Sequence, residues 1–129
     1  MGTSMPLTSV GAGILNPIQG AKIRGCKTII GVDRVASRLE LAKDLGATHV
    51  VDTGTIKGTL TEEIRGITEG VGTTITVDAA GAVPLIQQGV EFTANQGKMI
   101  LLGVPPMDAV LQIPLVPYTM VRTTGRRLL

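Results

Sequence analysis

The residues most informative about the fold are Lys27-Thr-Ile-Ile-Gly-Val-Asp33, continued by Arg34-Val-Ala-Ser-Arg-Leu-Glu-Leu-Ala-Lys-Asp-Leu-Gly-Ala-Thr-His-Val-Val-Asp52. Its first apolar run, residues 28–32, is mostly β-branched and shows no alternation with polar residues. That pattern is typical of a strand covered by helices on both faces. We therefore expect a buried strand that ends at Asp33.

A helix and a second strand follow within the same stretch. Ser37 and Glu40 match a capping box, and Gly46 suits the left-handed position just beyond the end of a helix. Val50 and Val51 then begin another apolar run that closes on an acid. A crossover of this length between parallel strands is almost always right-handed. The stretch thus predicts a parallel, layered sheet.

The rest of the chain repeats this alternation. Thr59 and Glu62 offer a second capping box, and Pro84 suits the first turn of a later helix that we expect Asn95-Gln-Gly97 to end. Further strands are predicted at residues 7–10, 73–77, 98–102, 109–113 and 127–129. Alternating strands and helices indicate an α/β class with a doubly wound, Rossmann-like, mainly parallel sheet, which we expect to be incomplete at both ends.

Length and composition favour a single dinucleotide-binding domain over residues 1–129, with a ragged lead-in at 1–6 and a truncated final strand at 122–129. The chain is 43% hydrophobic and 17% charged, which argues against disorder. Its apolar runs are shorter than the roughly 20 residues that span a bilayer. The first residues lack the features of a secretion signal, so we expect a cytoplasmic protein without membrane contact.

Nucleic-acid binding is disfavoured. The net charge is +2, and Lys and Arg are scattered among almost as many acids. Arg122, Arg126 and Arg127 cluster near the end, but Phe92 and Tyr118 are the only aromatic residues, so no platform for stacking bases is expected.

A dinucleotide fingerprint is partly present near the start. Gly11 and Gly13 match the first two glycines of G-x-G-x-x-G, whereas Asn16 replaces the third. Asp33 follows Gly11 by 22 positions, close to the roughly 20 that separate the fingerprint from the acid that binds a ribose. Asn16 would cap a helix whose first residue is Pro17. The alternative is a simple glycine-rich turn.

Together these motifs resemble the coenzyme-binding domain of the zinc-type, medium-chain alcohol dehydrogenases, and within them an aryl- or benzyl-alcohol-dehydrogenase-like subgroup. The resemblance covers most of residues 18–127. It is carried by five blocks in order, namely residues 21–33, 37–52, 64–70, 78–81 and 97–106.

The resemblance implies roles for particular residues. Asp33 would bind the adenosine ribose hydroxyls, with Arg38 as its basic partner. Backbone positions lining the adenosine and nicotinamide ends would be Gly81, Leu102, Gly103 and Val104. An acid repels a 2′-phosphate, so NAD is expected rather than NADP, although Arg34 weakens that preference.

The resemblance also implies a catalytic domain and a zinc that this chain does not supply. Its one cysteine, Cys26, and its one histidine, His49, fall short of the three protein ligands of a catalytic zinc. We therefore expect no metal site and no catalytic residue here, and an isolated chain without activity. Zinc belongs only to the parent family.

The glycine-rich segment has a second interpretation. Residues 11–16 also resemble a helix that precedes the coenzyme domain in this family, in which case the first strand and its glycine loop have been deleted. That loss would split the sheet and expose two strand edges. The position of residues 7–10 relative to residues 29–32 distinguishes the two interpretations.

Two functions follow from the sequence. The first is an NAD(H)-binding domain of an alcohol-dehydrogenase-like oxidoreductase, in which hydride transfer occurs only in the full-length parent. The second is a non-enzymatic fragment that associates with itself, through its final strand, or with full-length relatives. A methyltransferase is a weaker third option, because no catalytic region is evident.

Overall fold

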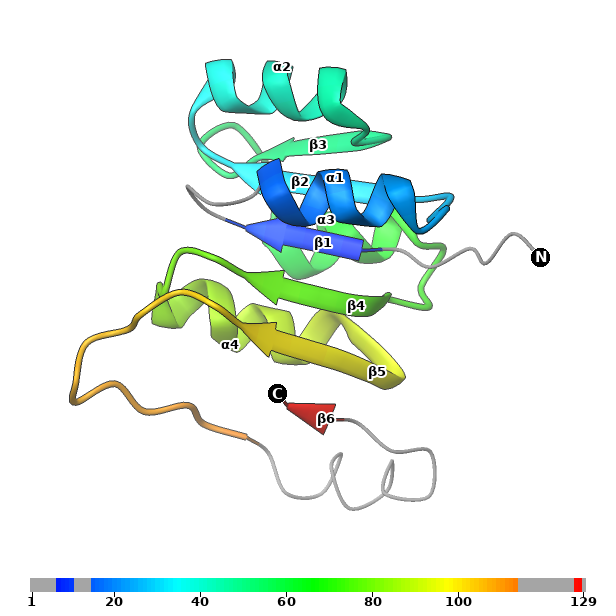
Figure 1. Ribbon diagram of the computed structural model, residues 1–129. Coiled ribbons are helices and arrows are strands. Elements are labelled where there is room, and N and C mark those ends of the chain that lie inside the picture. Colours follow the sequence, from blue (N-terminus) through cyan, green and yellow to red (C-terminus); the bar gives the residue numbers. More distant parts are fainter. Residues whose placement is uncertain (1–6, 11–14, 114–126, 129) are drawn as a thin grey trace.

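The computed structural model describes residues 7–10, 15–113 and 127–128. Its strands are β1 (Leu7–Val10), β2 (Ile29–Asp33), β3 (His49–Asp52), β4 (Thr73–Asp78), β5 (Thr93–Leu101) and β6 (Arg127–Leu128). Its helices are α1 (Leu15–Ile23), α2 (Ala36–Leu45), α3 (Leu60–Ile67) and α4 (Val83–Phe92). The strands form one parallel sheet in the order β3-β2-β1-β4-β5-β6 (Figure 1). This is the doubly wound α/β architecture that the sequence predicts.

The strand β1 lies in the middle of the sheet. Leu7 pairs with Ile29 of β2 on one side and with Ile75 of β4 on the other. The hypothesis that the first strand has been deleted is therefore wrong. The order of the sheet reverses between β1 and β4, and such a reversal is where ligands bind in open α/β sheets.

Two helical layers cover the sheet, and adjacent residues of β2 face different layers. Ile29 packs in a cluster with Ile18 of α1 and Ala42 of α2. Ile30 packs instead with Ile64 of α3, in a second cluster on the opposite face. Because both faces are buried, β2 needs apolar residues at consecutive positions, which explains its lack of polar alternation.

The two predicted capping boxes have different outcomes. At α3 the prediction is confirmed, because the Thr59 side chain accepts from the Glu62 backbone N–H while the Glu62 side chain accepts from the Thr59 N–H. At α2 it is wrong, since the helix begins at Ala36 and Ser37 already lies inside it. Gly46 ends α2 with φ of +130°, and its N–H caps two helical carbonyls.

Two helix boundaries differ from the sequence prediction. The helix α1 already includes Asn16, which is therefore not its N-cap. The helix α4 ends at Phe92, and Asn95–Gly97 lie within β5. The hydroxyl of Thr93 explains this second difference, because it donates to the Gly89 carbonyl and contacts the Thr76 hydroxyl at 2.7 Å, so the chain enters the sheet at once.

The last predicted strands also differ in outcome. Residues 109–113 are not a strand, because Gln112 pairs with the Gln87 side chain instead of a neighbouring strand. Arg127–Leu128 do form the edge strand β6, beside Lys98 and Met99 of β5. The predicted lead-in at 1–6 lies outside the described residues. None of the described helices is both long and apolar enough to cross a membrane.

Candidate functional site

The carboxyl ends of three strands bring three acids to one edge of the sheet. Asp33 lies beside Asp52 in the register of β2 and β3, while Val10 of β1 lies between Val32 and Asp78. Each acid also folds the loop that follows it. The pattern of apolar strands that close on an acid therefore marks one edge of the molecule.

In Asp33, one carboxylate oxygen accepts hydrogen bonds and the other accepts none from the described residues. Its Oδ1 atom accepts from the backbone N–H groups of Arg34 and Val35, at 2.7 and 3.2 Å, and so turns the chain into α2. Its Oδ2 atom is 3.3 Å from Nε of Arg38 in an ion pair. That oxygen is buried, yet it accepts no well-aligned hydrogen bond from the described residues. Buried carboxylate oxygens are normally satisfied, so this one has capacity for a further donor.

A cavity of about 520 Å³ opens beside this carboxylate. One wall is polar and comes from the ends of β2 and β3, and the other is apolar and comes from the loop after β4 and the start of α4. The lining residues are Val32, Asp33, Arg34, Arg38, Thr53, Ala79, Ala80, Ala82, Pro84 and Leu85. A ligand with hydroxyl donors at one end and a flat apolar group beside them fits these two walls.

The second acid, Asp52, lies outside the cavity lining and shapes the turn that carries Thr53. Its Oδ1 atom accepts from the Gly54 N–H at 2.8 Å, and its carbonyl accepts from the N–H groups of Thr55 and Ile56. The resulting turn lets the Thr53 N–H donate to the carbonyl of Asp33 at 3.1 Å. Thr53 is thereby fixed next to the carboxylate.

The third acid, Asp78, joins two loops into a corner. Its carboxylate accepts from the N–H groups of Ala80 and Gly81, at 3.3 and 3.0 Å. Its carbonyl accepts from the N–H groups of Leu102 and Gly103, at 2.8 and 3.0 Å. The loops after β4 and β5 are consequently held backbone against backbone.

Both loops need glycine at this corner. Gly81 has φ of +71°, and a Cβ atom there would lie 2.6 Å from the carbonyl oxygen of Val104. A Cβ atom on Gly103 would lie 2.2 Å from the backbone nitrogen of Gly81. These close approaches are between backbone atoms, so no side-chain rotation relieves them.

The structure divides the predicted site residues into three groups. Asp33 and Arg38 meet in the cavity. Gly81, Gly103 and Val104 meet at the Asp78 corner, outside the cavity lining, with Leu102 next to them and 61% exposed. Gly11 and Gly13 lie outside the described residues.

The apolar wall of the cavity and Thr53 were not among the predicted site residues. Thr53 carried a usable signal, because it directly follows the acid at the end of a strand that neighbours β2. Pro84 and Leu85 carried none, since they look like ordinary residues of a first helical turn. They reach the cavity only because the sheet order places β4 next to β1.

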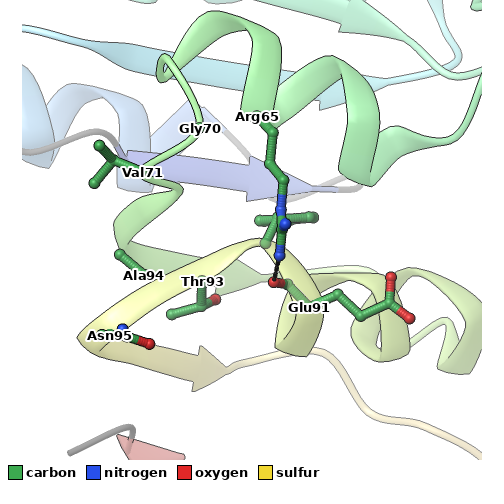
Figure 2. Close-up of a pocket in the computed structure, with 8 residues that line it drawn as sticks. Arg65, Gly70, Val71, Glu91, Thr93, Ala94 and Asn95 are labelled. Atoms are coloured by element: carbon green, nitrogen blue, oxygen red, sulfur yellow. Dashed lines mark hydrogen bonds between the residues drawn. The ribbon is translucent and has the colours of Figure 1, made fainter. Parts of the chain in front are cut away.

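A second cavity, of about 400 Å³, lies at the opposite edge of the sheet, where β4 and β5 begin. Figure 2 shows Arg65 crossing it to donate to the Glu91 carbonyl, at 2.8 Å. A cation at the carboxyl end of a helix is stabilising there, because the last carbonyls lack helical partners. This contact joins α3 to α4 and gives the second cavity a structural explanation.

The described residues do not fit a catalytic zinc. They contain no group of three or more His, Cys, Asp or Glu side chains that could hold a metal ion. Cys26 packs, half-buried, against the cluster around Ile18 and Ile29. His49 lies on β3 with its Nδ1 atom 2.9 Å from the Thr48 hydroxyl. The two side chains are thus occupied in separate local structures.

Known proteins are similar to this chain in both sequence and fold. A probable alcohol dehydrogenase from Pseudomonas sp is 34% identical over 113 residues, which is 87% of this chain and 35% of the relative. The crystal structure of benzyl alcohol dehydrogenase from Acinetobacter calcoaceticus is 31% identical, with a TM-score of 0.84 over 97% of this chain and 33% of that one.

A second similar structure contains a bound coenzyme. It is a zinc-binding dehydrogenase from Sinorhizobium meliloti bound to NADP, 27% identical, with a TM-score of 0.82 over 96% of this chain and 36% of that one. The chain spans about a third of the length of each of these relatives. The family described as zinc-binding dehydrogenase matches residues 15–128. The chain therefore belongs to the zinc-binding dehydrogenases, as the coenzyme-binding domain of an alcohol-dehydrogenase-like oxidoreductase.

Proposed function

We propose that this domain binds NAD(H) and that Asp33 accepts hydrogen bonds from the adenosine ribose hydroxyls. The observation that carries the proposal is the buried Oδ2 atom of Asp33, a residue that lines the cavity, because this oxygen accepts no hydrogen bond from the described residues and has capacity for a donor. A hydroxyl supplies such a donor, and its bond to a carboxylate is stronger than one between neutral groups. The apolar wall formed by Ala82, Pro84 and Leu85 suits the adenine ring.

The remaining predicted residues would contact the parts of the coenzyme beyond the adenosine. Gly11 and Gly13 would let backbone N–H groups approach the pyrophosphate at the start of α1, where the helix dipole favours negative charge. The corner of Gly81, Leu102, Gly103 and Val104 would line the nicotinamide end. Bound there, nicotinamide supplies the hydride acceptor, and the described residues supply its position.

NAD is preferred to NADP in this proposal, because the Asp33 carboxylate repels a 2′-phosphate. Arg34 and Arg38 oppose that repulsion, since both line the same cavity. Arg38 is already paired with Asp33, so part of its charge is compensated. We expect a preference for NAD of modest size rather than exclusion of NADP.

Oxidation of an alcohol is assigned to the full-length parent alone. The described residues provide no zinc site, and the chain spans about a third of its relatives. Similarity to benzyl alcohol dehydrogenase makes aryl alcohols the proposed substrates of that parent. The isolated chain is expected to be inactive and cytoplasmic.

Calorimetric titration with NAD and NADP tests the proposal. Asp33→Asn keeps an oxygen that can accept from the Arg34 and Val35 N–H groups but removes the charge, and we expect it to weaken NAD binding about tenfold, or about 1.4 kcal/mol. Asp52→Asn is the matched control, because it changes the neighbouring acid outside the cavity lining. Equal affinity of the Asp33 variant and the wild type, or no NAD binding by the wild type at millimolar concentration, would contradict the proposal.

A second candidate function is association through the edge strand. β6 is two residues long and lies outermost in the sheet, so β5 is paired there only at Lys98 and Met99 among the described residues. Incompletely paired edges are templates for strands of another chain. Light scattering after size exclusion tests this candidate, and a monomer at all concentrations would exclude self-association.

A further inference from the structure

The chain leaves β5 as an arch, defined here as residues 102–112, whose first end is fixed. The N–H groups of Leu102 and Gly103 both donate to the Asp78 carbonyl. Val104 then contacts the backbone of Gly81 so closely that a Cβ atom on that glycine would lie 2.6 Å from the Val104 carbonyl oxygen. The arch therefore begins at the carboxyl edge, where the proposed coenzyme site lies.

The other end of the arch is held by a side chain that replaces a strand. The Oε1 atom of Gln87 accepts from the Gln112 N–H at 3.0 Å, and the Nε2 atom of Gln87 donates to the Gln112 carbonyl. A carboxamide offers the same donor and acceptor as a peptide group, so it can pair with both backbone groups of one residue. Leu111 adds an apolar contact with the cluster of Ile86, Val90 and Met99.

Between these two ends the arch contains two prolines and displays exposed apolar side chains. Pro105 and Pro106 fix their own φ angles and restrict the residues before them. The Ala109 N–H donates to the Pro106 carbonyl at 3.0 Å and closes a turn. Val104 and Met107 are 89% and 105% exposed. Because prolines restrict this backbone and both of its ends are held, releasing the Gln87 end gives the whole arch more conformational freedom, including Val104 near the other end.

We propose that Gln87 is a positioning residue for the half of the coenzyme that extends beyond the Asp33 cavity. The inference rests on the proposed function. A dinucleotide bound at Asp33 runs outside the carboxyl ends of the strands, toward the switch point between β1 and β4. It then reaches the corner of Gly81 and Val104. Gln87 acts on that corner through the arch and does not line the Asp33 cavity.

Comparison of AMP with NAD on the full chain tests this role. AMP occupies only the adenosine end, whereas NAD also reaches the arch. We expect Gln87→Ala to leave AMP affinity unchanged and to weaken NAD about fivefold, because ordering the loosened arch then opposes binding. Gln87→Glu keeps the acceptor and loses the donor, and should fall between the two. Hydrogen exchange of the Gln112 amide should accelerate in the same order.

Gln88→Ala is the matched control. Gln88 is the next residue of α4, but its side chain accepts from the Leu60 N–H on α3 rather than from the arch. Gln88→Ala should therefore leave the ratio of NAD affinity to AMP affinity unchanged. If wild type binds both ligands and Gln87→Ala weakens both equally or neither, the positioning role is wrong and coenzyme binding stands. If wild type binds neither AMP nor NAD, coenzyme binding fails and the role of Gln87 fails with it.

Discussion

Replacing Gly81 with alanine should destabilise the protein by about 2–5 kcal/mol. The left-handed backbone of Gly81, at φ of +71°, accounts for about 1–2 kcal/mol of this once a Cβ atom is present. The new atom would also lie 2.6–2.9 Å from the backbone oxygen, carbon and nitrogen of Val104. Forcing two packed segments apart typically costs a further 1–3 kcal/mol.

Urea denaturation followed by far-ultraviolet circular dichroism measures this loss, since the chain has no tryptophan to report by fluorescence. With a slope of about 2 kcal/mol per molar urea, the midpoint should fall by roughly 1–2.5 M. Thermal unfolding should show the same order of variants.

Gly66→Ala is the control for the chemical change itself. Gly66 lies in α3 with open space where its Cβ atom would be, so alanine should stabilise the helix by about 0.5–1 kcal/mol. Opposite signs at the two positions are therefore expected. An unchanged midpoint for Gly81→Ala would refute the close approach of the two loops at the Asp78 corner.

Two further changes test the helices. Thr59→Ala should destabilise the protein by about 1 kcal/mol because it removes half of a formed capping box, whereas Ser37→Ala should change stability by less than about 0.5 kcal/mol because Ser37 caps nothing; equal effects in urea denaturation would contradict this. Ile64→Ala should cost about 3–4 kcal/mol, because Ile64 is fully buried between α3 and the sheet. Alanine at Ile23, which is 84% exposed, is its control and should leave the midpoint within about 0.5 kcal/mol of wild type.

Structural features could be predicted from the sequence wherever a residue pattern strongly favours one local structure. The apolar run of β2 indicates a strand buried on both faces, and the acid after it indicates the turn into a helix. The Thr59 capping box is a pair of hydrogen bonds within four residues, so the sequence alone contains both partners. The same pattern at Ser37 failed because α2 starts one residue before Ser37, with Val35 as its N-cap, so Ser37 is already a helical residue.

Helix and strand boundaries that depend on residues far away in the sequence could not be predicted from the sequence. Thr93 ends α4 by bonding to Gly89 and to Thr76, and Thr76 is 17 residues away in the chain. Residues 109–113 have the composition of a strand, yet the partner that Gln112 finds is a side chain on α4. A hydrogen bond between polar side chains far apart in the sequence leaves no apolar periodicity in either segment.

The amino-acid pattern specifies the alternation of strands and helices, the acids that end three strands, and the resemblance to a coenzyme-binding domain. The position of β1 between β2 and β4 follows from the folded chain, because the order of strands depends on pairing across the sheet. That order brings the loop after β4 against the end of β2 and creates the cavity beside Asp33. Individual site residues such as Asp33 can be recognised within short stretches of sequence. The cavity that a ligand would fill forms only between segments that the fold brings together.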